Sequence, residues 1–179
     1  MGTEPRAVTA LGADARVATQ LAGRDRFRHV LSHVPTGVVV VAGHDGTAPA
    51  GLAIGSFTSI SLDPPLVGFY PDRASTSWPP IRRAGSFCVN VLAAHQAGIC
   101  RRFARSGGDK FMGITWRPAA QSGAPILDGV VAWIDCELER EIELGDHSLV
   151  VGRVLDLGLE RPAAPLIFLR GGHPALARP

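Results

Sequence analysis

The sequence predicts a mainly β fold, an antiparallel barrel with helices inserted between its strands. About seven short apolar runs are separated by turn signals, and they do not alternate regularly with helical segments. This arrangement favours an antiparallel barrel over a doubly wound parallel sheet. No Gly-x-Gly-x-x-Gly motif opens a helix after a strand, so a nicotinamide or flavin cofactor, if bound, is not held by the dinucleotide-binding fold.

The chain length of 179 residues fits one globular domain with a substantial core. Residues 1–23 are rich in alanine and weakly patterned, so we expect a flexible tail or a loosely docked helix there and a single domain over 24–179. Asp25 can cap a helix whose apolar residues recur at helical spacing, and Pro35 ends it. We expect that helix to cover a core.

Short extended segments follow, separated by glycine- and proline-containing turns. The expected strands cover 37–43, 50–61, 66–70, 86–93, 130–143, 147–159 and 165–170. Gly145 and Asp146 form a hairpin signal between the two longest of them. A helix is expected over 75–84, where serines precede early prolines, and another over 95–105.

Charge and composition disfavour a nucleic-acid partner. The formal net charge is +2, the arginines are scattered, Lys110 is the single lysine and only 6% of the residues are aromatic. An anionic small molecule remains a candidate ligand. No segment approaches the length of a membrane span and the first residues lack a secretory signal, so we expect a soluble, cytoplasmic protein without a membrane partner.

The residues with metal-binding or catalytic chemistry form no recognisable set. Cys88, Cys100 and Cys136 are widely spaced in apolar surroundings, which is typical of reduced thiols in a cytosol, and no CxxC or HExxH motif is present. We therefore predict no metal site. No serine triad or paired carboxylates stand out, and four alternating glutamates from Glu137 to Glu143 indicate a solvent-facing strand side. If the chain is an enzyme, a cofactor performs the difficult step.

The segment 51–69 is unusual for a strand because small and hydroxyl residues interrupt its apolar pattern. One interpretation is a flat ligand lying against the backbone; the other, favoured by the pattern alone, is a barrel strand with tight corners. Ser75, Thr76 and Ser77 precede the expected helix and serve either to bind an anion or simply to cap it. His147 lies just after the hairpin turn, where it faces a pocket mouth or solvent, and Asp146 either orients it or serves the turn.

A series of motifs in a fixed order resembles the short-chain flavin reductases of two-component monooxygenases. The motifs are PTGVVVV at 35–41, SFTSISLDPPLV at 56–67, STSWPPI at 75–81, FCVNVL at 87–92, GDKF at 108–111, PILDG at 125–129, GDHSLVVGRV at 145–154 and PLIFLRGG at 165–172. The resemblance extends from Phe27 to about Leu176 and implies the FMN-binding split β-barrel, an antiparallel Greek-key fold.

The resemblance also implies an activity, an NAD(P)H:flavin oxidoreductase that reduces FAD or FMN by hydride transfer. NADH is favoured over NADPH. Such a protein is a homodimer that supplies diffusible reduced flavin to a partner monooxygenase. The alternatives are a non-catalytic flavin or haem carrier on the same barrel, and a flavin-dependent oxidase of a small substrate.

The residues that the resemblance assigns to the site are as follows. His147 would meet the nicotinamide as the catalytic residue, with Asp146 beside it. The flavin-binding residues would be Thr36, Gly37, Ala53, Ile54, Gly55, Ser56, Phe57, Thr58, Ser59, Ser75, Ser77, Trp78, Asn90, Val91, Leu92, Lys110 and Phe111. Among these, Ser75, Ser77 and Trp78 would lie at the ribityl phosphate. The strand that contains Ala53 would hold the ring, mainly through its backbone.

Overall fold

The computed structural model describes residues 23–176, which divide into two units at Pro35. In the first unit, residues 23–31 are helical, which confirms a helix in this region, but the helix begins before Asp25, so Asp25 does not cap it, and it ends at Leu31 rather than at Pro35. Its side chains Phe27, Val30 and Leu31 are exposed, so within this unit they cover no core. The predicted tail lies outside the described residues except for Gly23.

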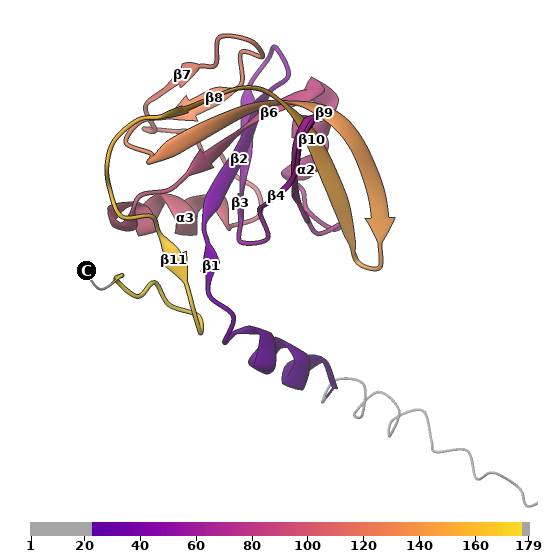
Figure 1. Cartoon of the computed structure of the whole chain (residues 1–179), viewed down its shortest axis with the longest axis vertical. Coiled ribbons are helices and arrows are strands. Elements are labelled where there is room, and N and C mark those ends of the chain that lie inside the picture. Colours follow the sequence, from indigo (N-terminus) through magenta and orange to yellow (C-terminus); the bar gives the residue numbers. More distant parts are fainter. Residues whose placement is uncertain (1–22, 177–179) are drawn as a thin grey trace, which may run out of the picture. The chain divides into compact units, whose positions relative to one another are not determined.

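The second unit consists of strands with short helices between them (Figure 1). In chain order its elements are β1 (Thr36–Gly37), β2 (Val39–His44), β3 (Pro49–Ile54), β4 (Thr58–Leu62), β5 (Pro65–Phe69), α2 (Trp78–Ala84), β6 (Ser86–Val91), the 3-10 helix η1 (Ala94–Gln96), α3 (Ala97–Phe103), β7 (Trp116–Pro118), β8 (Pro125–Leu127), β9 (Ala132–Leu144), β10 (His147–Leu159) and β11 (Ile167–Phe168).

Seven strands form one antiparallel sheet in the order β3-β2-β6-β9-β10-β5-β4. The two edge strands, β3 and β4, are joined by only three residues, 55–57. A flat sheet would separate its first and seventh strands by roughly 29 Å, whereas this connection spans at most roughly 14 Å. The sheet therefore curls until its edges approach each other, which agrees with the predicted split barrel.

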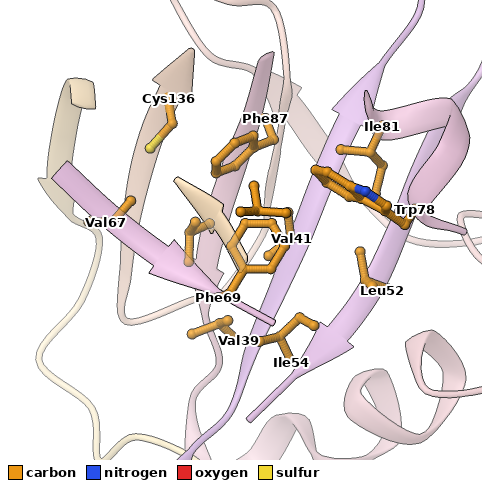
Figure 2. Packing of buried hydrophobic residues seen from close by; sticks show 12 residues of the cluster. Val39, Val41, Leu52, Ile54, Val67, Phe69, Trp78, Ile81, Phe87 and Cys136 are labelled. Atoms are coloured by element: carbon orange, nitrogen blue, oxygen red, sulfur yellow. The ribbon is translucent and has the colours of Figure 1, made fainter. Parts of the chain in front are cut away.

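The core lies on both sides of this curled sheet. On one side α2 places Trp78 and Ile81 against residues of β2, β3 and β5, and Figure 2 shows the indole near Phe69, with the two rings edge to face at 5.5 Å. On the other side α3 contributes Phe103, which packs edge to face on Phe111 at 5.1 Å. Trp78 thereby ties α2 to β5, and Phe103 ties α3 both to the loop that holds Phe111 and to β3, where its ring lies against Gly51.

Several predicted boundaries differ from those of the structure. The strand expected over 50–61 is two strands, because the chain crosses between the sheet edges at 55–57. The helix expected over 75–84 begins only at Trp78, and the one expected over 95–105 is η1 followed by α3. The stretch 107–129, in which the sequence predicts no strand, holds the short antiparallel pair β7 and β8.

The β9–β10 hairpin contains two β-bulges, and one of them changes the direction of its glutamates. Arg140 lies opposite Val151 and Leu138 opposite Gly152, so Glu139 is an extra residue on β9. A bulge of this kind reverses the inward and outward alternation beyond it. The expectation that all four alternating glutamates share a solvent-facing side is therefore wrong for Glu141, which lies opposite the fully buried Val150.

Candidate active site

A cavity of about 350 Å³ lies beside the edge strand β3. Its lining comes from three parts of the chain that are far apart in sequence, namely β3, the segment 72–77 and the turn that follows α3. The lining residues are Leu52, Ala53, Asp72, Ala74, Ser75, Ser77, Phe103, Ala104, Arg105, Ser106 and Lys110. Its volume falls in the range of small-molecule sites, and four predicted residues, Ala53, Ser75, Ser77 and Lys110, line it.

A second cavity of about 150 Å³ adjoins the first, because Ser77 and Lys110 line both. It also contains the predicted residue Phe111 and the neighbouring Gly108 and Asp109. Asp109 accepts hydrogen bonds from the backbone N–H groups of Phe111 and Met112, which folds the GDKF motif into a tight turn. The motif therefore reaches the site as a preformed loop.

Lys110 is the most unusual side chain of the site because it is a buried cation, with 9% of its surface exposed. Its ammonium group donates hydrogen bonds to Ser77 Oγ at 2.7 Å, Phe103 O at 3.1 Å and Gly51 O at 3.2 Å. All three partners are neutral, and none of the ion pairs among the described residues includes Lys110. Burial lowers the pKa of this ammonium group. An anion in either cavity would compensate its charge.

Ser75 and Ser77 present hydroxyl groups to the cavity from a turn rather than from a helix cap. Ser75 Oγ accepts the backbone N–H groups of Ser77 and Trp78, each at 3.3 Å. The Ser77 side chain makes no capping bond although it occupies the N-cap position of α2. Because Ser77 Oγ accepts a hydrogen bond from Lys110, its own O–H can donate a hydrogen bond to a ligand oxygen.

The glycines of segment 51–69 have different roles. A Cβ atom at Gly51 would lie 2.6 Å from the Phe103 ring, so this glycine serves core packing rather than ligand access. At Gly55 a Cβ atom would approach Thr36 Oγ1 at 3.1 Å, which brings two predicted site residues together. β3 pairs only with β2, and the outer side of its backbone remains outside the sheet ladder, where Gly51 O meets Lys110.

His147 reaches the site through the tip of the β9–β10 hairpin. Backbone hydrogen bonds join the tip to segment 71–75. Ser148 N–H donates to Pro71 O, and Arg73 N–H donates to Asp146 O. His147 also forms an isolated β-bridge with Asp72, which lines the cavity. The imidazole is half exposed, and its Nδ1 lies 2.8 Å from Asp146 Oδ1. The histidine thus stands at the rim of the larger cavity with its ring oriented by the preceding carboxylate.

Asn90, which the resemblance places along the site, lies outside the lining of both cavities. It is fully buried, donates to the carbonyl groups of Val40, Cys88 and Pro125 and accepts the backbone N–H of Leu127. This amide bonds strands β2, β6 and β8 together and has no group left for a ligand. The neighbouring Val91 and Leu92 also lie outside the cavity lining.

The other predicted residues lie around the crossing between the sheet edges. Ile54 is buried in the core with Phe57 packed partly against it, and Ser56 Oγ accepts the N–H of Tyr70 at 3.0 Å. Thr58 and Ser59 are exposed on β4. Thr36 and Gly37 form β1, which pairs with β11. These side chains flank the cavity without lining it.

Sequence reasoning missed several residues that do line the site. Arg105 and Ser106 follow α3, and only the basic face of that helix hinted at them. Asp72 begins an Asx turn, in which Ala74 N–H donates to the Asp72 carboxylate at 2.7 Å. Its place in the sequence, after Pro71 and shortly before Ser75, is typical of a turn and was the available signal.

A further cavity, of about 480 Å³, lies against α3 and contains none of the predicted residues. It is lined in part by His95, Arg102, Asp128 and Arg161, all of which are exposed. The buried cation that marks the site beside β3 has no counterpart in it.

Two other features of the described residues bear on the chemistry. Burial raises the pKa of Cys136 to about 12 and raises that of Cys88 as well, so these thiols are poor nucleophiles. Within residues 23–176 no cluster of three or more histidine, cysteine or carboxylate side chains could hold a metal ion. In the same range no helix is long and apolar enough to cross a membrane.

Comparison with known proteins places this arrangement in a family. A family model described as a flavin reductase like domain matches residues 31–177. The chain belongs to this family. This flavin reductase-like chain is 53% identical over 152 residues to a flavin reductase of Pseudomonas putida, with 84% of this chain and 89% of the relative covered.

Solved structures agree with that assignment. The nitrilotriacetate monooxygenase component B homologue of Mycobacterium thermoresistibile superposes with a TM-score of 0.82 at 40% identity, covering 89% of this chain and 94% of that one. An NADH:FAD oxidoreductase of Streptomyces globisporus, solved in complex with NAD and FAD fragments, gives a TM-score of 0.80 at 33% identity, covering 87% and 94%. The family resemblance and the mainly β fold predicted from the motifs are confirmed.

Proposed function

We propose that this flavin reductase-like protein oxidises NADH, transfers the hydride to FAD or FMN and releases the reduced flavin to a partner monooxygenase. The relatives are named for this activity: one is a flavin reductase, one is a monooxygenase component, and one is an NADH:FAD oxidoreductase. The described residues fit such a role, because hydride transfer between two stacked rings needs positioning and exclusion of water more than acid or base groups.

The observation that carries the proposal is the buried ammonium of Lys110 between two cavities. An isolated buried cation is unfavourable unless an anion arrives to balance it, and every flavin nucleotide carries a phosphate. The hydroxyl group of Ser77 would then donate a hydrogen bond to a phosphate oxygen. Ser75 stabilises the turn that positions this hydroxyl group. Charge-assisted bonds of this kind are among the stronger ones in proteins.

The remaining contacts follow from the position of the phosphate. With the phosphate at Lys110, the backbone of the edge strand β3 near Ala53 would hold the flavin ring. The nicotinamide approaches from the rim at which His147 stands, with Asp146 orienting the imidazole. No covalent attachment is needed, which suits a flavin that leaves after reduction.

We also propose that the protein is a cytoplasmic homodimer. Large apolar side chains are exposed on the sheet, among them Leu62 at 94% on the edge strand β4 and Leu159 at 87% on β10. Large contiguous patches of exposed apolar side chains are typical of protein–protein interfaces, and these leucines are candidates for such a patch. Light scattering of the purified protein tests this; a monomer at micromolar concentration would contradict it.

One steady-state assay tests the activity. NADH and NADPH are each combined with FMN and with FAD, and nicotinamide oxidation is followed by absorbance with and without the protein. We expect NADH oxidation to accelerate with at least one flavin, and the flavin to separate from the protein on gel filtration. A protein that retains flavin tightly but leaves both nicotinamides unoxidised would be a carrier, and the proposal would be wrong.

A further inference from the structure

Glu141 occupies a position that no motif singles out. The bulge at Glu139 places it on the core side of β9, opposite Val150, which itself lies opposite Phe69 on β5. Residues directly opposite one another in an antiparallel pair share a face of the sheet. A carboxylate therefore points to the side on which α2 packs, the side shown in Figure 2.

The partner of this carboxylate is the indole of Trp78. Trp78 Nε1 donates to Glu141 Oε1 at 3.0 Å, and the Trp78 side chain is only 5% exposed. A buried indole N–H needs an acceptor, and Glu141 supplies it with a charge. The second carboxylate oxygen lies 3.7 Å from an Arg82 nitrogen, so the group is held from two points of α2.

Trp78 is also the residue that ends the phosphate turn. Its backbone N–H donates to Ser75 Oγ, and it directly follows Ser77, which meets Lys110. A shift of Trp78 would therefore displace both hydroxyls of the turn. The start of the same segment is held by the hairpin tip, where Glu143 pairs with Arg73 at 3.1 Å.

We propose that Glu141 is a positioning residue for flavin binding: through Trp78 it fixes the two serines that receive the flavin phosphate. This inference rests on the proposed function, since it takes the flavin to bind at Ser77 and Lys110. Glu141 does not line either cavity, so it acts through its contacts with α2, of which the hydrogen bond to the indole is the shorter. The β9–β10 hairpin thus orients both ends of the segment 71–78.

Glu139 provides a matched control. It is a glutamate of the same strand, two residues away, and its carboxylate pairs with Arg153 at 2.7 Å. None of the hydrogen bonds and ion pairs among the described residues joins Glu139 to segment 71–78, and each of the two glutamates has an arginine partner, Arg153 for Glu139 and Arg82 for Glu141.

The experiment measures flavin dissociation constants by flavin fluorescence, and KM for flavin and for NADH in steady state. The variants are Glu141→Ala, Glu141→Gln, Trp78→Phe and Glu139→Ala. We expect Glu141→Ala to raise the dissociation constant and KM for flavin about tenfold and to leave the KM for NADH unchanged. Glutamine keeps an acceptor oxygen for the indole, so Glu141→Gln should stay within about threefold of the wild type. Glu139→Ala should match the wild type.

The route through the indole is tested by the double variant. If Glu141 acts through Trp78, Glu141→Ala combined with Trp78→Phe should weaken flavin binding no more than the larger single change. Unchanged flavin binding in Glu141→Ala, or an equal loss in Glu139→Ala, would overturn the positioning role while leaving the reductase activity intact. A wild-type protein that neither binds nor reduces flavin would instead refute the proposed function itself.

Discussion

The protein contains two buried polar clusters that look alike in burial and differ in charge balance. In the first, Asn90 bonds the backbone of three strands, and every bond joins neutral groups that satisfy one another. In the second, Lys110 also bonds three neutral acceptors, but its positive charge takes part in none of the ion pairs among the described residues. The first cluster is complete without a ligand, whereas the second is balanced only when an anion binds.

The two clusters show how a buried polar side chain that stabilises the fold differs from one that is suited to bind a ligand. Within the described residues no buried side-chain nitrogen or oxygen lacks a hydrogen-bond partner, so hydrogen bonding alone does not distinguish the two clusters. Net charge does, because a protein interior penalises an uncompensated charge even when its protons are all donated. Removing a side chain from each cluster should therefore affect stability and flavin binding differently.

Replacing Asn90 should damage the fold and spare the site. Asn90→Ala leaves the bonded carbonyl groups and the Leu127 N–H without their partner, so we expect a loss of about 3 kcal/mol or more in the free energy of unfolding. Urea denaturation measures this. Flavin affinity of the folded fraction should stay at the wild-type value. A stable variant that no longer binds flavin would place Asn90 in the site.

Replacing Lys110 should instead weaken flavin binding and spare the fold. Lys110→Met keeps much of the side-chain volume and removes the charge, so FMN should bind about tenfold to hundredfold more weakly. Riboflavin, which lacks the phosphate, is the matched ligand control and should bind both proteins equally. Equal weakening of both ligands in a fluorescence titration would show that Lys110 supports the cavity rather than the phosphate.

The pH dependence of FMN binding should report the same charge. Because burial lowers the pKa of Lys110 from 10.5, the ammonium loses its proton below that pH, and FMN affinity should fall as the pH rises through the lowered pKa. We expect a loss of up to about tenfold per pH unit above it. The folding stability of the flavin-free protein should change with pH in the opposite direction. Lys110 binds its proton more tightly in the unfolded chain than in the folded one, so the free energy of unfolding rises with pH between the lowered pKa and 10.5.

Two controls define that measurement. Lys110→Met should remove the alkaline fall in FMN affinity, and riboflavin should show none with the wild type. A fall of equal size in Lys110→Met would assign the titration to another group.

The smallest effect is expected at the hairpin tip. His147→Ala should raise the KM for NADH about fivefold, since one contact at a solvent-accessible rim contributes roughly 1 kcal/mol. The dissociation constant for flavin should not change, because His147 does not line the cavity. An unchanged KM for NADH would remove His147 from the nicotinamide site.

Much of the site could be predicted from order along the chain. The motifs around Ser75, Lys110 and His147 name residues that the fold does bring together, although more than thirty residues separate each from the next. Asn90 belongs to an equally clear motif, but its amide bonds neighbouring strands and lies outside the cavity lining. Sequence alone could not separate the two cases, because a motif records that residues occur together and not which of them faces the cavity.

The mainly β fold and the family follow from the linear sequence, since strand patterns and motif order are properties of the chain. The direction of Glu141 depends instead on how two strands pair in three dimensions. Regular alternation predicts that it faces solvent with its neighbours, but one extra residue in the pairing of β9 with β10 reverses the faces beyond it. That bulge is defined by the partner strand, and it turns a surface glutamate into the acceptor for Trp78.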